Sequence, residues 1–395
     1  MAEPWLSIIG IGEDGLAGLG EASRNALARA ETIFGGPRHL ALAGIGATGR
    51  PWPVPFDVAP VLALRGRQVA VLASGDPFHH GAGAVLARHL DSGEWIAYPA
   101  PSAFSLAAAR LGWALERTTC LGLHAAPFEV LRPHLAPGAR LLCLLRAGAA
   151  PTALASWLDS WGFGNSQLHI LEALGGPRER VRTVTARCFD LDKIEAPVMA
   201  ALEVRGASGL PRTPGLPDGF FVHDGQITKA PARALTLAAL APRAGECLWD
   251  LGAGSASVAI EWCLAGGRAV AVERRDDRLA GIDANIAAFG LGPAVTVVAA
   301  DWIDALPTLP PADAVFVGGG MTAAAFDTLW PRLRTGCRLV INAVTLETEG
   351  LVVAAAARLG GTLLRFELAE ARPLGRFRGW APARPIVQWS ITKCG

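Results

Sequence analysis

One stretch constrains the fold of this chain more than any other, the segment 246–261 with the sequence ECLWDLGAGSASVAIE. Its apolar run 247–251 predicts a buried strand, which passes through glycines directly into a segment that predicts a helix. Gly252 and Gly254 remove side chains at this turn, so a ligand can approach the backbone at the helix N-terminus. A strand, a glycine turn and a helix in this order are typical of an α/β nucleotide-binding domain.

Acidic residues stand where three successive predicted strands of this region end. Asp250 lies just before the glycine turn, Glu273 ends the apolar run 268–272, and Asp301 follows the run 294–300. In nucleotide-binding folds, a carboxylate at the end of the second strand binds the ribose hydroxyls. We expect Glu273 to bind ribose and Asp301 to accept a hydrogen bond from an adenine amino group.

Two cofactors would suit this geometry, and the residues favour one of them. A dinucleotide site requires the spacing G-x-G-x-x-G, whereas the sixth position here is Ser257. Asp250 would repel a pyrophosphate, but its charge suits the cationic end of S-adenosylmethionine. The sequence therefore predicts an S-adenosylmethionine site rather than an NAD site, with a purely structural turn as the alternative.

Length and composition limit the remaining possibilities. A chain of 395 residues exceeds one ordinary hydrophobic core, so two domains or more are expected. The net charge is +1 and no block of Lys or Arg occurs, which argues against a nucleic-acid partner. The seven cysteines are scattered without a C-x-x-C pair, so neither a disulfide framework nor a metal site is predicted. Since no signal peptide and no apolar run of about 18 residues is found, we expect a cytoplasmic protein without membrane contact.

The N-terminal half repeats the pattern of strand, glycine turn and helix. The apolar run 5–11 contains Gly10 and is followed by Gly12 and a predicted helix near 20–30. Such a turn faces a ligand in some α/β proteins and is an ordinary connection in others, so both interpretations stay open here.

Two further predicted strands of this half end in breakers. The strand over 68–73 runs into Ser74-Gly75-Asp76-Pro77, which predicts a rigid, sharply turning loop. The strand over 95–98 leads into Ser102 and an Ala-rich helix that ends near Leu111. Strands predicted at 118–123, 140–145, 168–172 and 197–203, with a helix over 151–161, continue the pattern. We therefore expect two α/β lobes with a cleft between them.

Three histidines lie close to these predicted turns. His79 and His80 are adjacent and no third ligand is apparent, so a surface or cleft position is favoured over a metal site. His124 follows the predicted strand 118–123. A histidine at a strand end is more often structural, and contact with substrate is the alternative for His124.

The three loops of the N-terminal half, taken in order, resemble one known family. G-x-G-E-D-G near the start, S-G-D-P-x-x-x-G in the middle and P-x-P-S-A-F before the Ala-rich helix are similar to the tetrapyrrole (corrin) methylase family. The resemblance covers about residues 4–204. It implies two α/β lobes that bind S-adenosylmethionine in their cleft. The residues that it places at the cofactor are Gly10, Gly12, Gly75, Asp76, Pro77 and Ser102.

A linker separates this half from the rest of the chain. Residues 206–219 hold several Pro and Gly breakers and almost no apolar periodicity. We therefore predict an N-terminal domain over 1–205, a linker over 206–217 and a C-terminal domain over 218–395.

Two residues ahead of the first C-terminal helix invite alternative interpretations. Thr228 is a good N-cap for the helix predicted over 232–240, and it would otherwise lie over the cofactor. Lys229 is one of three lysines in the chain and would pair with a substrate carboxylate.

Other features of the C-terminal half concern the substrate. Gly318, Gly319 and Gly320 end a predicted strand, where a flat molecule could approach the backbone. Asn342 ends the next predicted strand. The loop predicted over 371–380 carries three arginines, which are either solvated or a clamp for a polycarboxylate: Arg372, Arg376 and Arg378.

The C-terminal half resembles the class I methyltransferase module that methylates and decarboxylates a precorrin. The matching segments are Thr228-Lys229, W-D-L-G-A-G-S from Trp249, Glu273, A-D-W from Ala300, V-G-G-G from Val317 and N-A-V-T-L-E-T from Asn342. Ala256 departs from the third glycine that relatives commonly have. The resemblance implies that the cofactor contacts are Thr228, Asp250, Gly252, Ala253, Gly254, Ser255, Ala256, Glu273, Ala300, Asp301 and Gly318.

The tandem order of the two modules resembles the precorrin-6B 5,15-methyltransferase (decarboxylating) family. This implies methylation of a precorrin at ring carbons 5 and 15, with loss of the ring C acetate carboxylate, in cobalamin biosynthesis. The C-terminal half would act at carbon 15 and decarboxylate, and the N-terminal half would act at carbon 5. The implied substrate contacts are Gly319, Gly320, Asn342, Arg372, Arg376 and Arg378, and the catalytic candidates are Lys229, His223, Asp224 and His124.

Two rival functions are consistent with parts of the sequence. One is an RNA methyltransferase, which the balanced charge disfavours. The other is a methyltransferase with a single site, whose N-terminal half is a binding scaffold. Relatives of both modules form oligomers, so we also expect a homo-oligomer.

Overall fold

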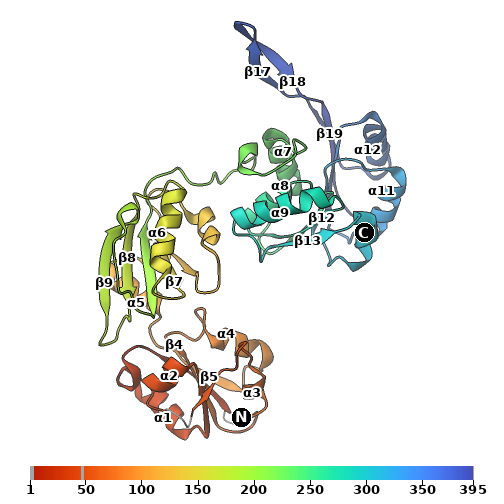
Figure 1. Cartoon of the computed structure of the whole chain (residues 1–395). Coiled ribbons are helices and arrows are strands. Elements are labelled where there is room, and N and C mark those ends of the chain that lie inside the picture. Colours follow the sequence, from red (N-terminus) through yellow and green to blue (C-terminus); the bar gives the residue numbers. More distant parts are fainter. Residues whose placement is uncertain (1–3, 46–48, 395) are drawn as a thin grey trace. The chain divides into compact units, whose positions relative to one another are not determined.

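The computed structural model describes residues 4–45 and 49–394 and separates into two compact units (Figure 1). Unit 1 comprises Met1–Phe128 and His134–Gly209, and unit 2 comprises Glu129–Pro133 and Leu210–Gly395. Leu216, from the segment predicted as a linker, is buried in the core of unit 2, and Leu210 packs against that core. Among the described residues, no helix is long and apolar enough to cross a membrane.

The first lobe of unit 1 is a parallel sheet with the strand order β3-β2-β4-β1-β5. Strand β1, which lies between β4 and β5, is buried at every position because helices cover both faces, and apolar clusters fill the two sides. The elements are β1 Leu6–Ile11, α1 Glu21–Arg29, β2 Thr32–Gly35, α2 Pro37–Leu42, β3 Arg50–Pro51, α3 Ala59–Leu62, β4 Val69–Ser74, α4 Ala82–Leu86 and β5 Trp95–Tyr98.

The second lobe of unit 1 has the strand order β6-β7-β10-β8-β9. Strands β7 and β8 run in the same direction, as expected for strands joined by a helix, but β10 lies between them and is antiparallel to both. The predicted succession of strand, helix and strand is therefore present, while the antiparallel strand inserted between β7 and β8 was not predicted. Its elements are α5 Ala103–Leu111, β6 Thr119–Gly122, β7 Arg140–Leu145, α6 Ala150–Ser160, β8 Gln167–Glu172, β9 Arg180–Thr185 and β10 Val198–Glu203.

Unit 2 is a seven-stranded sheet with the order β13-β12-β11-β14-β15-β19-β16. Strands β11 to β15 are parallel, and β19 is antiparallel to both of its neighbours. The predicted Rossmann-like α/β fold is confirmed. The elements are α7 Ala230–Leu240, β11 Cys247–Leu251, α8 Ser257–Leu264, β12 Arg268–Glu273, α9 Asp276–Ala288, β13 Val295–Ala299, α10 Trp302–Ala305, β14 Ala314–Val317, α11 Ala323–Leu329, β15 Arg338–Ala343, α12 Leu346–Leu359, β16 Thr362–Phe366 and β19 Ile386–Thr392.

Strand β11, which lies between β12 and β14, shows how this sheet is packed. Side chains alternate along a strand, so Trp249 and Leu251 join one buried cluster while Leu248 joins the cluster on the other face. Asp250 shares the face of Leu248 and meets helix α8 there. This alternation carries a carboxylate into the interior directly beneath the glycine turn.

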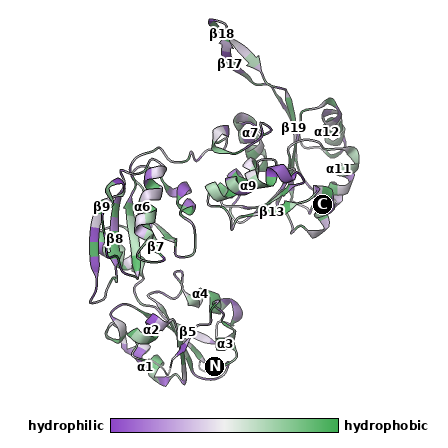
Figure 2. Cartoon of the chain, in the orientation of Figure 1, coloured by the Kyte–Doolittle hydropathy of each residue, from purple (hydrophilic) through white to green (hydrophobic). Residues whose placement is uncertain are grey.

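The segment predicted as a loop over 371–380 is instead a β-hairpin. Strands β17 (Ala369–Leu374) and β18 (Phe377–Pro382) pair antiparallel, and Gly375 has a φ of +58° at the turn. The hairpin extends away from the seven-stranded sheet (Figure 1) and carries both hydrophobic and hydrophilic residues (Figure 2). The loop prediction is wrong because the backbone pairing here leaves most side chains exposed, so no buried periodicity marks the strands.

Candidate functional site

Unit 1 contains a cavity of about 420 Å³ between its two lobes. Residues from the ends of β1 and β4 line it on one side, and residues of β7, β8 and β10 line it on the other. Four of the residues predicted from the sequence meet in this cavity: Gly12, Gly75, Ser102 and His124. His79 and His80 line it as well, which agrees with the cleft position favoured for them.

Other predicted residues shape the loops around the cavity without lining it. A Cβ atom on Gly10 would lie 1.8 Å from the Gly75 carbonyl oxygen, so only glycine fits where β1 approaches this turn. The Asp76 carboxylate accepts a hydrogen bond of 2.8 Å from the Phe78 backbone N–H. The Pro77 carbonyl accepts one of 3.0 Å from the Gly83 N–H. Gly10, Asp76 and Pro77 therefore hold the turn in shape.

Ser102 caps the helix that points its N-terminus at the cavity. Its hydroxyl accepts a hydrogen bond of 3.1 Å from the Ser105 N–H, and the residue is buried. A helix N-terminus favours a negatively charged group nearby. The position makes Ser102 a capping residue whose other face borders the cavity.

A polar cluster on the cavity wall was not predicted. Arg38 forms an ion pair with Glu13 and donates a hydrogen bond of 2.7 Å to the Ser74 hydroxyl. His39 Nε2 lies 2.7 Å from the same hydroxyl, and burial with the nearby Arg38 charge lowers the pKa of His39 to about 4. Arg38 and His39 lie in α2, directly after the four-residue strand β2 and two glycines, and this repeat of strand, glycines and helix was the signal by which they could have been found.

The glycine turn of unit 2 follows β11 as predicted. Gly252 and Gly254 have φ values of +73° and +61°, and Ala256 has a φ of +55°, which is unusual for a residue with a side chain. The Gly254 N–H donates a hydrogen bond of 2.9 Å to the Glu273 carboxylate. Glu273 also accepts a hydrogen bond of 2.9 Å from the Arg275 N–H. The carboxylate that was predicted to bind a ribose therefore also stabilises the glycine turn.

Asp250 is a buried carboxylate with few compensating contacts. It is 2 % exposed and accepts a hydrogen bond of 3.1 Å from the Ala259 N–H. Burial raises the pKa of Asp250 to about 7; that hydrogen bond opposes the rise, and the neighbouring Glu273 adds to it. A carboxylate in this state is stabilised by a cation placed beside it.

The remaining predicted cofactor residues lie at the carboxyl ends of the same strands. Asp301 caps α10, accepting a hydrogen bond of 3.0 Å from the Ile303 N–H, and lies 3.5 Å from Arg274. The Ala300 N–H donates to the Glu273 carbonyl at 3.1 Å. Ala253 and Ser255 belong to the glycine turn. Gly318 ends β14, and a Cβ atom there would lie 4.0 Å from the Thr228 hydroxyl.

A buried arginine holds the segment before α7 against this turn. Arg233 is 0 % exposed, forms ion pairs with Glu261 and Asp218, and donates to the Thr228 carbonyl. The Gln226 carbonyl lies 3.6 Å from the position of a Cβ atom on Gly254. Thr228 does not cap the helix with its side chain, since Lys229 occupies that position without a capping hydrogen bond. Lys229 is exposed and lies 3.6 Å from the Asp218 carboxylate.

A second cavity of about 260 Å³ borders the glycine turn of unit 2. His223, Asp224, Gly254 and Ser255 are among the residues that line it. The Gln226 N–H and the ion pair with Arg278 lower the pKa of Asp224, so it holds no proton to donate near neutral pH. The ion pair with Arg278 thus favours a role for Asp224 other than proton donation. His223 Nδ1 accepts a hydrogen bond of 3.0 Å from the Gly225 N–H.

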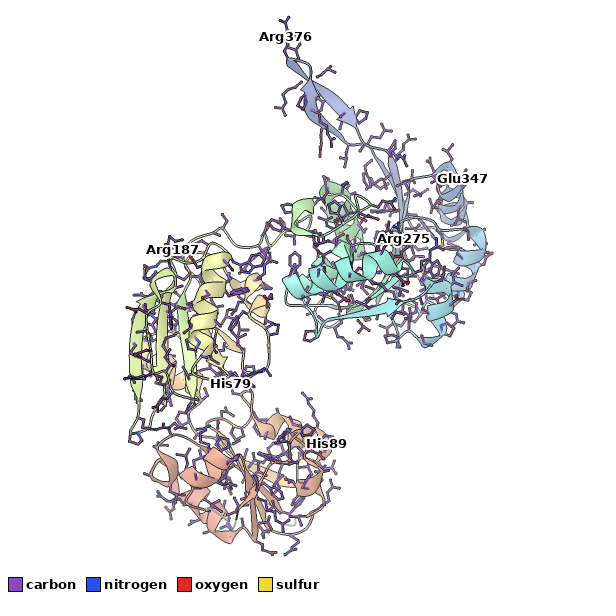
Figure 3. All side chains as sticks on the ribbon, viewed as in Figure 1. His79, His89, Arg187, Arg275, Glu347 and Arg376 are labelled. Carbon is purple, nitrogen blue, oxygen red and sulfur yellow. The ribbon has the colours of Figure 1, made fainter. Side chains whose placement is uncertain are left out.

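The structure separates the predicted substrate contacts. Gly319 and Gly320 are open, since a Cβ atom on either would meet no atom within 4 Å. Asn342 is 2 % exposed and bonded to Thr236 and Gln388, which corrects its assignment to a substrate surface. The three arginines are on the hairpin, and Arg376 lies at its outer tip (Figure 3). Arg372 pairs with Glu370, and Arg378 donates to the Ala371 carbonyl.

Comparisons with known proteins match the two halves separately and the chain as a whole. Residues 6–189 match the family of tetrapyrrole (corrin/porphyrin) methylases, and residues 219–393 match the precorrin methyltransferase domain. A protein of Sinorhizobium sp. named precorrin-6Y C(5,15)-methyltransferase [decarboxylating] is 48% identical, over 100% of this chain and 97% of its own length.

Two further matches cover about half of the chain. A protein of Pyrobaculum aerophilum named probable cobalt-precorrin-6B C(15)-methyltransferase (decarboxylating) is 30% identical over 44% of this chain and 93% of its own length. The crystal structure of the C-terminal domain of precorrin-6Y C5,15-methyltransferase from Rhodobacter capsulatus is 54% identical. It covers 47% of this chain and 100% of that chain, with a TM-score of 0.46.

Proposed function

Because the chain belongs to the family of precorrin-6Y C(5,15)-methyltransferases (decarboxylating), we propose that it methylates a precorrin at ring carbons 5 and 15. The same enzyme removes the acetate carboxylate of ring C as carbon dioxide, in cobalamin biosynthesis. The observation that carries this proposal is the full-length similarity, which joins a tetrapyrrole methylase module and a precorrin methyltransferase module in one chain.

We further propose that S-adenosylmethionine is the methyl donor in both units. When bound, it supplies a methyl group activated by the positive charge of its sulfonium. In unit 2 the glycine turn leaves room beside the backbone, and the buried Asp250 carboxylate favours a cation there. In unit 1 the cavity bordered by Gly12, Gly75 and Ser102 is the corresponding position.

The two methylations are proposed to occur in different units. A relative that matches less than half of this chain is named for the carbon 15 methylation and the decarboxylation alone, so one module is sufficient for both of those steps. We assign them to unit 2 and the carbon 5 methylation to unit 1. For the substrate contacts of unit 2 we retain Gly319 and Gly320, where a flat ring meets open backbone, and Lys229 as a partner for a carboxylate.

Assembly and location complete the proposal. We propose a homo-oligomer in which the β17–β18 hairpin contacts a second copy of this chain. Three large apolar side chains of the hairpin support this, since Leu374, Phe377 and Trp380 are 68%, 66% and 76% exposed. A cytoplasmic location, expected from the sequence, also remains a proposal.

A direct assay tests the proposed reaction. The purified full chain is incubated with S-adenosylmethionine and the precorrin for which its relatives are named, and the product is analysed by mass spectrometry. We expect a product that has gained two methyl groups and lost one carbon dioxide. A product with a single added methyl group would favour the alternative in which unit 1 is only a binding scaffold. Methylated RNA in place of a methylated ring would contradict the proposed reaction.

A further inference from the structure

The cavity of unit 1 gathers three imidazole rings from both of its lobes. His79 and His80 come from the loop after β4, and His124 comes from the segment after β6. The ring centres of His79 and His80 are 5.4 Å apart, and those of His80 and His124 are 6.5 Å apart. His80 therefore occupies the middle of the group, and Phe104 packs against it at 5.8 Å.

The backbone accommodates this arrangement at two positions. His80 has a φ of +61°, a left-handed conformation that costs a residue with a side chain about 1–2 kcal/mol. A Cβ atom on Gly122 would lie 3.0 Å from His80 Nδ1 and 3.1 Å from His124 Cε1. Glycine at this point of β6 thus gives the two rings their space. Strained residues of this kind concentrate where a side chain must take a particular position.

The rings are available for proton transfer. All three imidazoles border the cavity, and none of them forms a hydrogen bond with a residue that the structure describes. Burial is the main cause that lowers the pKa of His124 below the usual value, with His80 and Arg146 adding to it. Burial likewise lowers the pKa of His79, with His80 adding to it and Asp76 opposing it. His79 and His124 are therefore neutral, proton-accepting groups at pH 7.

Metal binding by these histidines, and proton uptake by another group of the cavity, are both disfavoured. Over the described part of the chain, no set of three or more His, Cys, Asp or Glu side chains has the geometry to hold a metal ion. In the second polar cluster of the cavity Glu13 is paired with Arg38, and burial with the Arg38 charge lowers the pKa of His39 to about 4, although its Nδ1 has no hydrogen-bond partner among the described residues. Neither of those groups can take up a proton as easily as an unpaired imidazole.

We propose that the pair His80 and His124 accepts the proton released by methylation in unit 1. This inference rests on the proposed function. As the methyl group passes from sulfonium to ring carbon, the carbon–sulfur bond breaks with its electrons going to sulfur, and a carbon–carbon bond forms from ring π electrons. The ring gains the positive charge that sulfur loses. Neutrality returns when a ring N–H gives its proton to an imidazole nitrogen of the pair, which later passes it to water.

Three variants of the full chain test the pair. The first, His80→Asn, removes the imidazole but keeps a residue that tolerates a positive φ. The second is His124→Asn, and the third is the double variant with both substitutions. The matched control is His89→Asn. His89 is an exposed histidine of the same lobe that does not line the cavity and lies apart from His79 (Figure 3). Each protein is assayed for the rate at which the first and second methyl groups appear in the precorrin, and for S-adenosylhomocysteine binding by calorimetry.

The expected outcome separates the proton acceptor from a structural role. Each single variant should slow one of the two methylations about 100-fold with S-adenosylhomocysteine binding unchanged, and the double variant should be no slower than the slower single one. The His89 variant should match the unaltered chain. Rates within about threefold of the unaltered chain in both single variants would overturn the pair. If the unaltered chain itself adds no methyl group, the proposed function fails instead.

Discussion

At the scale of single residues, Asp250 predicts how donor binding depends on pH. Its carboxyl group is buried and its pKa is raised to about 7, so it is mostly protonated at pH 6 and mostly ionised at pH 8. The α-ammonium group, the cation that S-adenosylhomocysteine shares with S-adenosylmethionine, binds beside the ionised form only. Since the apparent affinity scales with the fraction of the competent form, S-adenosylhomocysteine should bind unit 2 about tenfold more tightly at pH 8 than at pH 6.

Calorimetry on the full chain in buffers of different ionisation enthalpy checks this dependence. Binding below pH 7 should release a proton, because the ligand draws Asp250 into its ionised form. Asp250→Asn preserves an acceptor for the Ala259 N–H but cannot titrate, and should lose both the proton release and the pH dependence. Equal affinity at pH 6 and pH 8 in the unaltered chain would show that Asp250 does not face the cationic end.

At the scale of elements, the buried Arg233 ties the segment before α7 to helix α8. Its partners Glu261 and Asp218, together with the carbonyls of Leu216 and Thr228, satisfy a guanidinium that has no access to solvent. Arg233→Met leaves the Glu261 carboxylate buried without its cation and should destabilise unit 2 by about 3–5 kcal/mol. The double variant Arg233→Met/Glu261→Met should recover part of this loss, since the unpaired buried carboxylate of Glu261 is gone and Asp218 keeps its ion pair with Lys229.

Hydrogen exchange and urea unfolding of the full chain measure this effect. Amides of 215–229 should exchange faster in the Arg233 variant, and the affinity for S-adenosylhomocysteine in unit 2 should fall because Thr228 and Gln226 lose their placement beside the turn. Arg243→Ala is the control. It breaks an exposed ion pair with Glu246 and should cost less than about 1 kcal/mol. An Arg233 variant as stable as this control would show that the network is not needed.

The β17–β18 hairpin is an element whose role lies outside its own unit. An exposed apolar surface on a two-stranded arm gains stability when another chain covers it. The double variant Phe377→Asp/Trp380→Asp should therefore lower the assembly mass measured by light scattering. Phe56→Asp, which alters a half-exposed aromatic residue of unit 1, should leave the mass unchanged. If the mass is unaltered and methylation is lost, the hairpin contacts the substrate rather than a second copy.

At the scale of the whole molecule, sequence patterns were most informative where strands are buried and turns need glycine. Strands β1, β4 and β11 were predicted because each is a mainly apolar run that ends at a glycine turn, and β12 because its apolar run ends in an acidic residue. Short or exposed strands such as β2 and β9 carry no such run, and the insertion of β10 between β7 and β8 depends on long-range pairing that local patterns do not encode.

The backbone features of the candidate sites could be predicted, whereas the hydrogen-bond and ion-pair partners of their polar residues could not. The glycine turns and the acids after the strands could be located because backbone geometry requires them. Whether a polar residue is free depends on partners distant in the chain. Asn342 is bonded to Thr236 and Gln388, and Asp224 is paired with Arg278, and local sequence indicates neither set of partners.

The last prediction concerns the number of donor sites in the intact chain. If each unit binds its own donor, titration of S-adenosylhomocysteine into the full chain should saturate two sites, and a variant in one unit should remove only one. Gly12→Val places a branched side chain at the cavity of unit 1, where the nearest atom is Asp14 Oδ1, 2.6 Å from the position of the added Cβ. Glu273→Ala removes the acceptor that holds the Gly254 turn of unit 2.

Each of these variants should retain one site, and their combination should bind no ligand. Product analysis of the same proteins then links each site to one methyl group: Gly12→Val should spare decarboxylation, because that step is assigned to unit 2. One site in the unaltered chain, abolished by Glu273→Ala and unaffected by Gly12→Val, would make unit 1 a scaffold that binds the tetrapyrrole. In that event the proton-accepting role of His80 and His124 would also be excluded.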